Sequence, residues 1–592
     1  MKRLFSQPGE NHRDYTLHTV VFLITISTRA FFLIWIDEPI LFIKYPFFAE
    51  KLANGVDIGN RLVDLSPFYL YFLTLLKTLF GVSWTFIKCF QIVIGAINAL
   101  LVFIIGIRLF NRSAAFIGAL IFAFYGNLIV LETTLEPTVF VLLFNLLSVY
   151  FLILSGNKSK SRNHSILNIL AAGVFTGMAI ITKPNFLLFL PVGVAWILTF
   201  RKTDFGFGKN LVHALLFLCT TFLIIAPITT RNYLKLHDFV LVTADAGKVF
   251  FHGNSKTATA IVGADLLENN PYAKSNSEPD FAHVVFRKTA SRIAGETLSP
   301  SQATRFWINT TLKDIFDDPQ LYLTRQFKKL VHFFTDYEIH YIASAHKEYK
   351  KTLSYPFLRY GIIIALGFLG ILLSLKKFKT VFLIYGAIGV YLVSCTIFLV
   401  NTRYRTPAVP YFCLFTGYAI YCLQDMARKR QFKHLGIYAI LVSTFYFSTQ
   451  FTFKSAILKH DRWQEATKIH YEVDGRSAFT NRKHADAVVS LNKCIKILPN
   501  FYPAYILRGR SYAILGDYEK AEADFNHAIS LNPENPDGYK NIGFVYLLQK
   551  KTDAAESALN EALKHDPKNE KIRETLATLI KQKKAEQGMN NP

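Results

Sequence analysis

The chain has 592 residues, of which 51% are hydrophobic and 54 are phenylalanine, far more than one soluble core needs. This composition excludes a soluble globular enzyme and indicates a membrane protein. The formal net charge of +24 at pH 7 fits the basic loops that orient membrane helices, and no basic patch with interleaved aromatic residues indicates nucleic-acid binding.

Apolar segments of roughly 20 residues, the length that crosses a bilayer, begin near residue 17 and continue to about residue 452. The first segment lacks a small-residue cleavage site, so we expect it to be retained as a signal anchor. The segment 66–80 is short and carries Lys77, so we expect a helix that lies at the membrane surface. The sequence predicts about eleven spans, at 17–36, 85–107, 113–131, 137–155, 165–182, 185–200, 210–230, 357–375, 380–400, 406–425 and 434–452.

The positive-inside rule sets the orientation of these spans. With a cytoplasmic N-terminus, every cytoplasmic segment carries Lys or Arg, for example Arg108 and Arg112 after the second span. The segments then predicted to be extracytoplasmic are 37–84, the turn 132–136, the long loop 231–356 and all residues after 453.

Basic residues also occur at the extracytoplasmic ends of predicted spans, against the orienting rule. Snorkelling to lipid phosphates explains one such residue, but several together favour a function. Arg403 and Arg405 are two residues apart in "NTRYRTPAVPYF", and we expect an extended segment that turns both toward one cavity. Guanidinium groups there would bind a phosphate through paired hydrogen bonds. The other residues of this kind are Lys183 in "ITKP" and Arg231 in "TRNY".

Carboxylates gather on the same face. Asp37 and Glu38 follow the first span in "IWIDEPI", and Glu132 and Glu136 flank the short turn in "VLETTLEP". One carboxylate at a helix end is often only a cap. Carboxylates beside cations, in contrast, suit a general base that acts near a phosphate leaving group.

These motifs, in this order, resemble the C-type membrane glycosyltransferases, which use polyprenyl-phosphate-linked sugars and include the protein O-mannosyltransferases and the aminoarabinose transferase of lipid A. The resemblance covers about residues 15–425 and includes "DLSPFYLYFLTLLKTLFG", "LEPTVFVLLFNLLSVYFL", "TRNYLKLHDFVLVTADAGKVFFHGN" and "RYRTPAVP". The chain departs from the family's pattern in two places. The surface helix begins with Ser66 and Pro67 where a Pro-Pro pair is common, and Glu136 stands where some members have Asp.

The resemblance implies roles for the residues found above. Asp37 is the expected catalytic base, with Glu38 as the alternative, and Glu136 is the second catalytic acid. The residues expected to bind the donor phosphate are Arg403, Arg405, Lys183 and Arg231. The resemblance leaves open a divalent metal ion held by Asp37 and Glu136, and it implies no other cofactor.

The last part of the chain has a different pattern. Pro499, Pro533 and Pro567 recur every 34 residues, and "AYILRGRSYAILGDYEKAEADFNHAISLNP" matches the tetratricopeptide repeat. We expect three repeats and a capping helix at 570–584. The repeat domain then spans 465–592 and follows a membrane domain at 1–455.

The sequence therefore predicts an all-α polytopic membrane protein followed by an α-solenoid. We expect an inverting glycosyltransferase that moves a hexosyl or pentosyl group from a polyprenyl phosphate to an extracytoplasmic hydroxyl. The acceptor is a protein, a lipid or an envelope glycan, and the repeats are available to bind it. The expected location is the bacterial inner membrane, with the N-terminus in the cytoplasm and the repeats outside.

Two other functions fit parts of the sequence. A flippase or exporter of lipid-linked sugars would carry ionisable residues within its spans, whereas the charged residues found here collect at the outer ends. A non-catalytic scaffold would use the membrane part only as an anchor for the repeats, and it would tolerate loss of Asp37.

Overall fold

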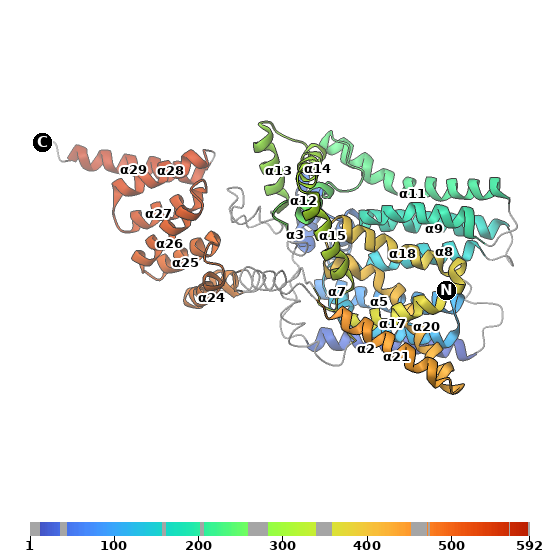
Figure 1. The fold of residues 1–592 in the computed structure, drawn as a ribbon. Helices are drawn as coiled ribbons and strands as arrows, with labels where there is room; N and C mark the ends of the chain where they lie inside the picture. The colour runs from blue at the N-terminus through green and yellow to red at the C-terminus, as the bar shows by residue number, and fades with distance from the viewer. Residues whose placement is uncertain are drawn as a thin grey trace. The chain divides into compact units, whose positions relative to one another are not determined.

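A computed structural model of the chain describes residues 12–35, 44–156, 162–201, 206–258, 282–338, 358–451, 470–471, 474–567 and 569–589. All regular secondary structure in these ranges is helical, as predicted (Figure 1), and the residues Tyr125 and Leu358 form an isolated parallel bridge. The chain divides into two compact units, Met1–Gly263 with Ser299–Phe453 and Ala264–Leu298 with Lys454–Pro592. The predicted domain bounds, 1–455 and 465–592, stay predictions.

Seven segments of the described residues are long and apolar enough to cross a membrane, so the chain is an integral membrane protein. One of them, Tyr360–Ile397, contains two of the predicted spans. The count of eleven stays a prediction. The helices of these segments are α2 (His12–Trp35), α5 (Trp84–Leu109), α8 (Thr138–Ser155), α9 (Arg162–Thr182), α11 (Phe207–Leu236), α17 (Tyr360–Ser374), α18 (Phe378–Ile397), α19 (Thr402–Arg405) and α20 (Val409–Arg428).

Two predicted spans have a different form in the structure. The segment predicted at 113–131 is interrupted near Phe124 and divides into α6 (Arg112–Ala123) and α7 (Gly126–Thr133). The interruption lies where Leu358 N donates to Phe124 O at 2.9 Å, so a second part of the chain satisfies the freed backbone group. The other is the short segment Pro184–Phe200, which is made of η2 (Pro184–Leu188), α10 (Phe189–Ala195) and η3 (Trp196–Phe200). The segment predicted at 434–452 forms one helix, α21 (Phe432–Thr449).

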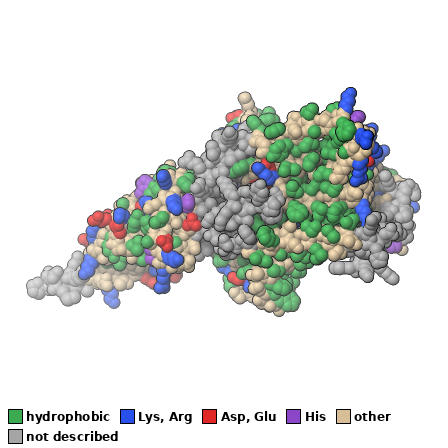
Figure 2. Space-filling model, turned by 90° about the horizontal axis from the view of Figure 1, so that it is seen from below, with side chains coloured by type: hydrophobic (Ala, Val, Ile, Leu, Met, Phe, Trp, Pro, Cys, Tyr) green, Lys and Arg blue, Asp and Glu red, His purple; other side chains and the backbone are tan. Residues whose placement is uncertain are grey.

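Small residues let the membrane helices pack closely. A Cβ at Gly417 of α20 would overlap the carbonyl oxygen of Ala114 in α6, and a Cβ at Gly370 of α17 would overlap that of Phe415 in α20. The three helices therefore meet backbone to backbone, as is typical of helices in membranes. The outer side of the bundle is apolar, for example at Ile440 of α21, which is 68% exposed. Figure 2 shows such a hydrophobic face, with Lys and Arg gathered at one edge.

The predicted surface segment forms α4 (Pro67–Phe80), preceded by the short helix α3 (Lys44–Ala53). Tyr69 and Leu73 of α4 are fully buried, whereas Leu79 and Phe80 are more than half exposed. An apolar face that remains exposed fits a helix at the membrane surface. This placement stays a prediction.

The predicted loop 231–356 contains helices of its own. In unit 1 these are α12 (Ala246–Asn254), α14 (Pro300–Asp317) and α15 (Pro319–Phe334). Ser299 caps α14 in a capping box with Gln302, since each side chain accepts from the other residue's backbone N–H. Helices α12 and α14 pack on each other, and α15 packs on the membrane helix α18.

Unit 2 contains the tetratricopeptide repeats. Its helical pairs follow the predicted register, and Gly509 lies so close to Phe525 that an added Cβ would be 2.8 Å from the ring. Ala521 and Ala528 are buried as well, so the consensus positions pack helix on helix. Besides α13 (Ala282–Ala294), the helices of unit 2 are α23 (Arg476–Thr480), α24 (His484–Ile497), α25 (Tyr502–Ile514), α26 (Tyr518–Leu531), α27 (Pro536–Leu548), α28 (Thr552–His565) and α29 (Glu570–Met589).

Candidate functional site

Glu136 lies in the turn between α7 and α8 and is fully buried. Its Oε1 accepts a hydrogen bond from Arg403 Nη1 at 2.5 Å, and its Oε2 accepts one from Thr138 Oγ1 at 2.9 Å. Two predicted site residues that are 267 positions apart in the sequence therefore form an ion pair. Because both carboxylate oxygens are engaged, Glu136 orients the Arg403 guanidinium.

Buried polar contacts from two neighbouring helices hold this turn in place. Gln91 of α5 donates from Nε2 to Thr134 O at 2.6 Å, two residues before Glu136. Tyr69 of α4 donates from its hydroxyl to Gln91 Oε1 at 2.5 Å. The surface helix and the acidic turn are thus joined through one glutamine side chain, and losing it would leave buried polar groups unpaired.

Lys183 lies in the turn between α9 and η2, next to the same cluster. Its Nζ is 4.3 Å from the centroid of the Tyr404 ring, and the Arg403 guanidinium is 5.4 Å from that centroid. Ser66, just before α4, donates from Oγ to Thr182 O at 2.7 Å and so fixes the residue preceding Lys183. The segments around Ser66, Lys183 and Arg403 are distant in sequence, and together they bring two cations to the Tyr404 ring.

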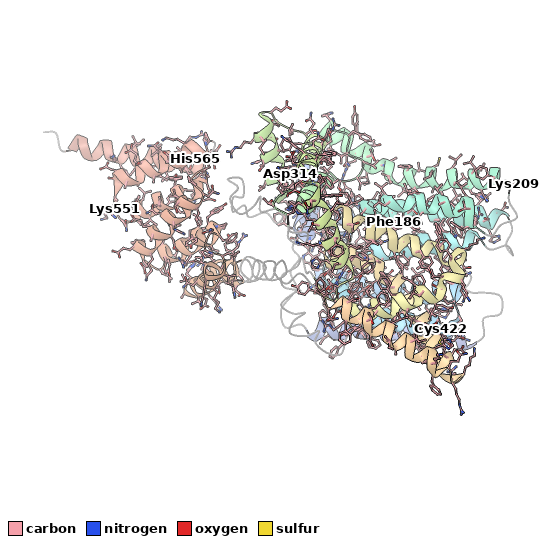
Figure 3. The ribbon with its side chains drawn as sticks, in the orientation of Figure 1. Phe186, Lys209, Asp314, Cys422, Lys551 and His565 are labelled. Carbon is pink, nitrogen blue, oxygen red and sulfur yellow. The ribbon has the colours of Figure 1, made fainter. Side chains whose placement is uncertain are left out.

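Burial, together with the nearby Arg403 guanidinium, lowers the pKa of Lys183 to about 7, although Glu136 partly offsets this effect. Within the described residues, the Lys183 ammonium makes no hydrogen bond and no ion pair. A desolvated cation without a counter-ion is a natural partner for an incoming anion. Lys183 and Arg403 are therefore the two candidate cations for an anionic ligand at this site. Phe186, which follows in η2, is labelled among the helices of unit 1 in Figure 3.

Arg405 does not join this site, and its prediction as a phosphate ligand is not supported by its contacts. Its side chain is 1% exposed and pairs with Glu338 Oε2 at 2.8 Å. The guanidinium also donates to the backbone carbonyls of His332, Phe333, Thr335 and Tyr337 at 2.7–3.3 Å. It lies over the Tyr360 ring, 4.0 Å from the ring centroid. These partners enclose the guanidinium and join it to the end of α15. Its predicted contact with the donor phosphate stays a prediction.

The prediction that Arg403 and Arg405 lie in an extended segment was wrong. Residues Thr402–Arg405 form the short helix α19, whose N-cap Asn401 accepts from Tyr404 N at 2.9 Å. Positions two apart on a helix point about 200° apart, because each residue turns by about 100°. The helix therefore directs the two arginines to different sides.

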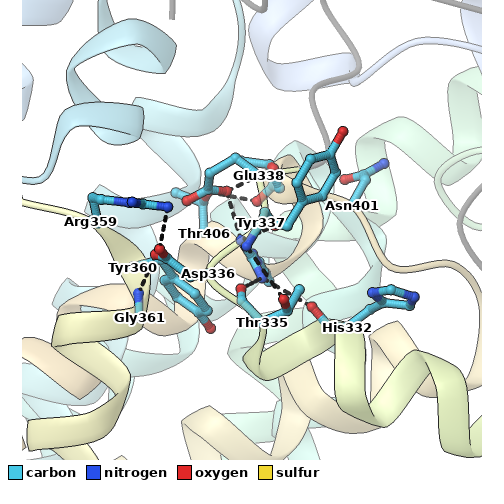
Figure 4. Close-up of polar contacts among 12 residues, drawn as sticks. His332, Thr335, Asp336, Tyr337, Glu338, Arg359, Tyr360, Gly361, Asn401 and Thr406 are labelled. Atoms are coloured by element: carbon cyan, nitrogen blue, oxygen red, sulfur yellow. Dashed lines mark hydrogen bonds and ion pairs between the residues drawn. The ribbon is translucent and has the colours of Figure 1, made fainter. Parts of the chain in front are cut away.

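Glu338 completes the buried cluster around Arg405. It accepts from Tyr125 OH at 2.6 Å and from Thr402 Oγ1 at 2.8 Å. Nearby, Asp336 accepts from the backbone N–H of Gly361 at 2.7 Å and pairs with Arg359 (Figure 4). These contacts join the end of α15 to α17, α19 and the α6–α7 interruption.

Arg231, near the end of α11, contacts α4 and η1 (Gly59–Val63). Its Nη1 donates to Tyr71 OH at 2.8 Å, and its Nη2 lies 3.5 Å from Leu62 O. None of its described contacts is with Glu136, Lys183 or Arg403. Its predicted contact with the same phosphate stays a prediction.

Asp37 and Glu38, the predicted base and its alternative, lie outside the described residues. Eight residues before Asp37, Arg29 of α2 is fully buried, and its Nε donates to Glu132 Oε2 at 2.7 Å. Arg29 Nη1 also donates to Ala123 O at the end of α6. This ion pair joins the C-terminal part of α2 to α7, the helix that precedes the acidic turn. In the part of the chain that the structure describes, no three His, Cys, Asp or Glu side chains could hold a metal ion together.

Sequence reasoning missed three residues near the site. Arg29 was detectable, because an arginine inside a membrane span needs a partner. Tyr404 stands between the two arginines in "RYR", where an aromatic residue is a usual neighbour of a cation. Gln91 lies in an apolar helix without any local pattern that predicts its contacts.

Comparisons with known proteins confirm the resemblance predicted from the sequence. Residues 64–229 match the family described as dolichyl-phosphate-mannose-protein mannosyltransferase. Residues 509–550 match a family of TPR repeats, and residues 537–569 match the tetratricopeptide repeat family. The first of these matches contains Glu136 and Lys183 together with α4.

Individual relatives share smaller parts of the chain. Hsp70-Hsp90 organizing protein 3 of Arabidopsis thaliana is 32% identical over 119 residues, which are 20% of this chain and 21% of that protein. Anaphase-promoting complex subunit 3 of Schizosaccharomyces pombe is 31% identical over 88 residues, which are 15% and 13% of the two chains. This chain thus spans about a fifth or less of the length of these relatives.

Among solved structures, the oligosaccharyltransferase of Archaeoglobus fulgidus tethered with an acceptor peptide is similar over 81% of this chain and 59% of its own. The TM-score is 0.43 and the identity is 11%. The TPR domain of Arabidopsis OM64 is similar over 20% of this chain and 96% of its own, with a TM-score of 0.19 and 22% identity.

Proposed function

We propose that this chain is an integral-membrane glycosyltransferase that moves a sugar from a polyprenyl phosphate to an extracytoplasmic hydroxyl. The observation that carries the proposal is the cluster of Glu136, Arg403 and Lys183, two parts of which lie within the region that matches a mannosyltransferase family. The description of that family names a dolichyl-phosphate-linked donor, which supports a lipid-linked donor here.

In this proposal the donor phosphate binds between Lys183 and Arg403. The acceptor oxygen attacks the anomeric carbon, the bond from that carbon to the phosphate oxygen breaks, and the acceptor proton passes to a carboxylate. The leaving phosphate gains negative charge as the bond breaks, so the two cations stabilise the transition state more than the bound donor. Attack from the face opposite the phosphate inverts the anomeric configuration.

Glu136 has an orienting role in this scheme. Its two oxygens hold Arg403 Nη1 and Thr138 Oγ1, so it fixes the direction in which the guanidinium points. The base must then be another carboxylate, and Asp37 is proposed, with Glu38 as the alternative. A divalent metal ion at Asp37 stays an open part of the proposal.

Two observations argue against the alternative functions, a flippase and a scaffold. Arg29 and Glu132 are charged residues in the membrane region, but they are fully buried and bound to each other, as expected of a structural pair. A scaffold has no need of the Lys183 ammonium, whose burial costs free energy without a paired carboxylate. Both observations favour the transferase.

The acceptor, the location and the orientation are proposed as follows. The repeats lie outside the cytoplasm, together with the acidic turn, and bind protein acceptors, and the chain lies in a bacterial inner membrane. A reporter enzyme fused after residue 455 should be active only outside the cytoplasm. Activity in the cytoplasm would overturn this orientation.

The function itself is tested by transfer in isolated membranes, with a defined polyprenyl phosphate that carries a labelled sugar. Asp37→Asn keeps the shape of the side chain but cannot take a proton, so turnover should fall by on the order of a hundredfold or more. Lys183→Ala should lower kcat as well as raise the KM for the donor. Lys313→Ala, on the exposed face of α14, serves as the matched control. Near-normal turnover of Asp37→Asn would move the base to Glu38, and an unchanged Lys183→Ala would refute the role of Lys183 in donor binding. No transfer by the wild type would refute the proposed function.

A further inference from the structure

Two buried basic residues on α15 cap the ends of two other helices. Arg325 donates from Nη1 to Asn254 O at 3.0 Å and from Nη2 to Lys256 O at 2.6 Å, at the end of α12. One turn later, Lys329 donates from Nζ to Thr396 O at 3.0 Å and to Phe398 O at 2.9 Å, at the end of α18. Helix C-termini carry partial negative charge, so both contacts are electrostatically favourable.

Lys329 is fully buried and its hydrogen bonds are complete. Its third proton is donated to Asn254 Oδ1 at 2.7 Å, so three donors meet three acceptors. No carboxylate among the described residues forms an ion pair with it. A buried ammonium held only by neutral oxygens depends on the geometry of all three. Any shift of α12, α15 or α18 would break that arrangement.

Asn254 and Gly253 make this contact tight. Asn254 Nδ2 donates to Ile397 O at 2.9 Å, next to the carbonyls that Lys329 binds. A Cβ at Gly253 would overlap Phe398 O, so only glycine allows α12 to approach the end of α18 this closely. We call the contact of Gly253, Asn254 and Lys329 with residues 396–398 the α18 joint.

The α18 joint is connected to the segments that carry the two cations of the candidate site. Phe398 is four residues before Thr402, where α19 begins and carries Arg403. On α18 itself, Ser394 Oγ accepts from Asn185 Nδ2 at 3.2 Å, two residues after Lys183. The outer end of α18 therefore contacts the segments of both Lys183 and Arg403.

We propose that Lys329 is a positioning residue of the transferase, which fixes the outer end of α18 and thereby the distance between Lys183 and Arg403. The inference rests on the proposed function for its effect on transfer, but its structural part does not. Lys329 does not touch the donor. It acts through the backbone carbonyls of the turn that leads to Arg403.

The first test is hydrogen exchange of the detergent-solubilised full chain, which needs no substrate. Lys329→Met keeps the length of the side chain and removes its donors, so amides of residues 398–406 should lose protection while those of α5 and α8 keep theirs. Gly253→Ala should disrupt the same joint while Lys329 is retained, because the added Cβ would overlap Phe398 O. Lys313→Met, the same change at an exposed lysine of α14, is the matched control and should match the wild type.

The second test measures transfer in a double-mutant cycle. Lys329→Met should lower turnover by on the order of ten- to a hundredfold, the cost of a small displacement of catalytic groups. In an Arg403→Ala background the same change should cost much less, because the residue that it positions is already gone. The transfer assay uses the labelled polyprenyl-phosphate sugar described above.

The outcomes separate the two proposals. If the joint variants lose protection at residues 398–406 but the wild type transfers no sugar, the structural role of the α18 joint is supported and the proposed function is refuted. Unchanged exchange in both Lys329→Met and Gly253→Ala would overturn the joint. If Lys329→Met lowers turnover equally in the wild type and in Arg403→Ala, Lys329 does not position Arg403. Unfolding of the whole chain in both joint variants would also refute the positioning role.

Discussion

Arg403 and Arg405 lie on one short helix, and their surroundings differ in almost every respect. The Arg403 side chain is 18% exposed, pairs with Glu136 and lies near the same Tyr404 ring as the Lys183 ammonium. The Arg405 side chain is 1% exposed and is bound by Glu338 and four backbone carbonyls. The first cation can meet a ligand, and the second joins helices.

The difference teaches that identical residues in one motif need not share a role. The sequence "TRYR" places both arginines at one membrane boundary, and bidentate binding of phosphate is chemically available to each. A helical turn in place of an extended segment separates them. The predictions below use this difference, beginning with the largest expected effect.

Arg405→Ala should abolish the folded state. The substitution leaves the buried Glu338 carboxylate without its cation and frees the carbonyls that Arg405 binds, and breaking a buried ion pair in this way costs about 3–5 kcal/mol. Size-exclusion chromatography and thermal unfolding of the detergent-solubilised chain measure the loss. A stable Arg405→Ala protein that has lost only transfer would return Arg405 to the donor site.

Arg403→Ala should lower turnover by on the order of a hundredfold, the effect of one lost donor to a developing oxyanion. It should also reduce thermal stability, because Glu136 is left as a buried unpaired carboxylate. Adding Glu136→Gln to Arg403→Ala should restore stability without restoring transfer. If the double variant recovers both, Arg403 serves only to neutralise Glu136.

Lys183 should make donor use depend on pH near neutrality. Its pKa of about 7 means that the ammonium is charged below this pH and neutral above it, so the cationic site weakens as the pH rises. A hydrogen bond to a charged group contributes about 1.5–3 kcal/mol, so kcat/KM should fall on the order of tenfold when Lys183 loses its proton. Lys183→Arg stays charged, so in this variant kcat/KM should no longer fall as the pH rises through about 7. If kcat/KM depends on pH in the same way in the wild type and in Lys183→Arg, another group causes the pH dependence.

Thr402→Val should have the smallest effect. Thr402 Oγ1 donates to Glu338 Oε2 at 2.8 Å in the Arg405 cluster, and valine keeps nearly the same shape. Loss of one such hydrogen bond should reduce the free energy of unfolding by about 1–3 kcal/mol. Transfer by the folded fraction should equal that of the wild type, since Thr402 faces Arg405. A specific loss of turnover would place the two clusters in one functional unit.

The sequence predicted those parts of the fold that repeat or that are long and apolar. The 34-residue spacing of Pro499, Pro533 and Pro567 predicted the repeats, because each repeat buries the same small positions against its neighbours. Hydropathy predicted the long spans. It gave no sign of the interruption near Phe124, since the backbone there is satisfied by Leu358, from a segment far along the chain.

The sequence also predicted part of the candidate site. Glu136, Lys183 and Arg403 were placed together because charged residues at one membrane face must share a narrow layer. The fate of Arg405 was not predictable, because it depends on Glu338 and on carbonyls at the end of α15, which no spacing connects with it. The same holds for Lys329, whose acceptors are two backbone carbonyls and one amide from other helices.

The Arg29–Glu132 ion pair has a consequence for biosynthesis. Arg29 is made 103 residues before Glu132, which takes roughly 5–20 s at 5–20 residues per second. During that interval the first span carries a guanidinium without its carboxylate, and an arginine in a membrane helix costs about 2.5–3.5 kcal/mol at the helix centre. The first helix should therefore stay at the insertion machinery until α7 has emerged, and a nascent chain stopped before residue 132 should crosslink to that machinery more than one stopped after it.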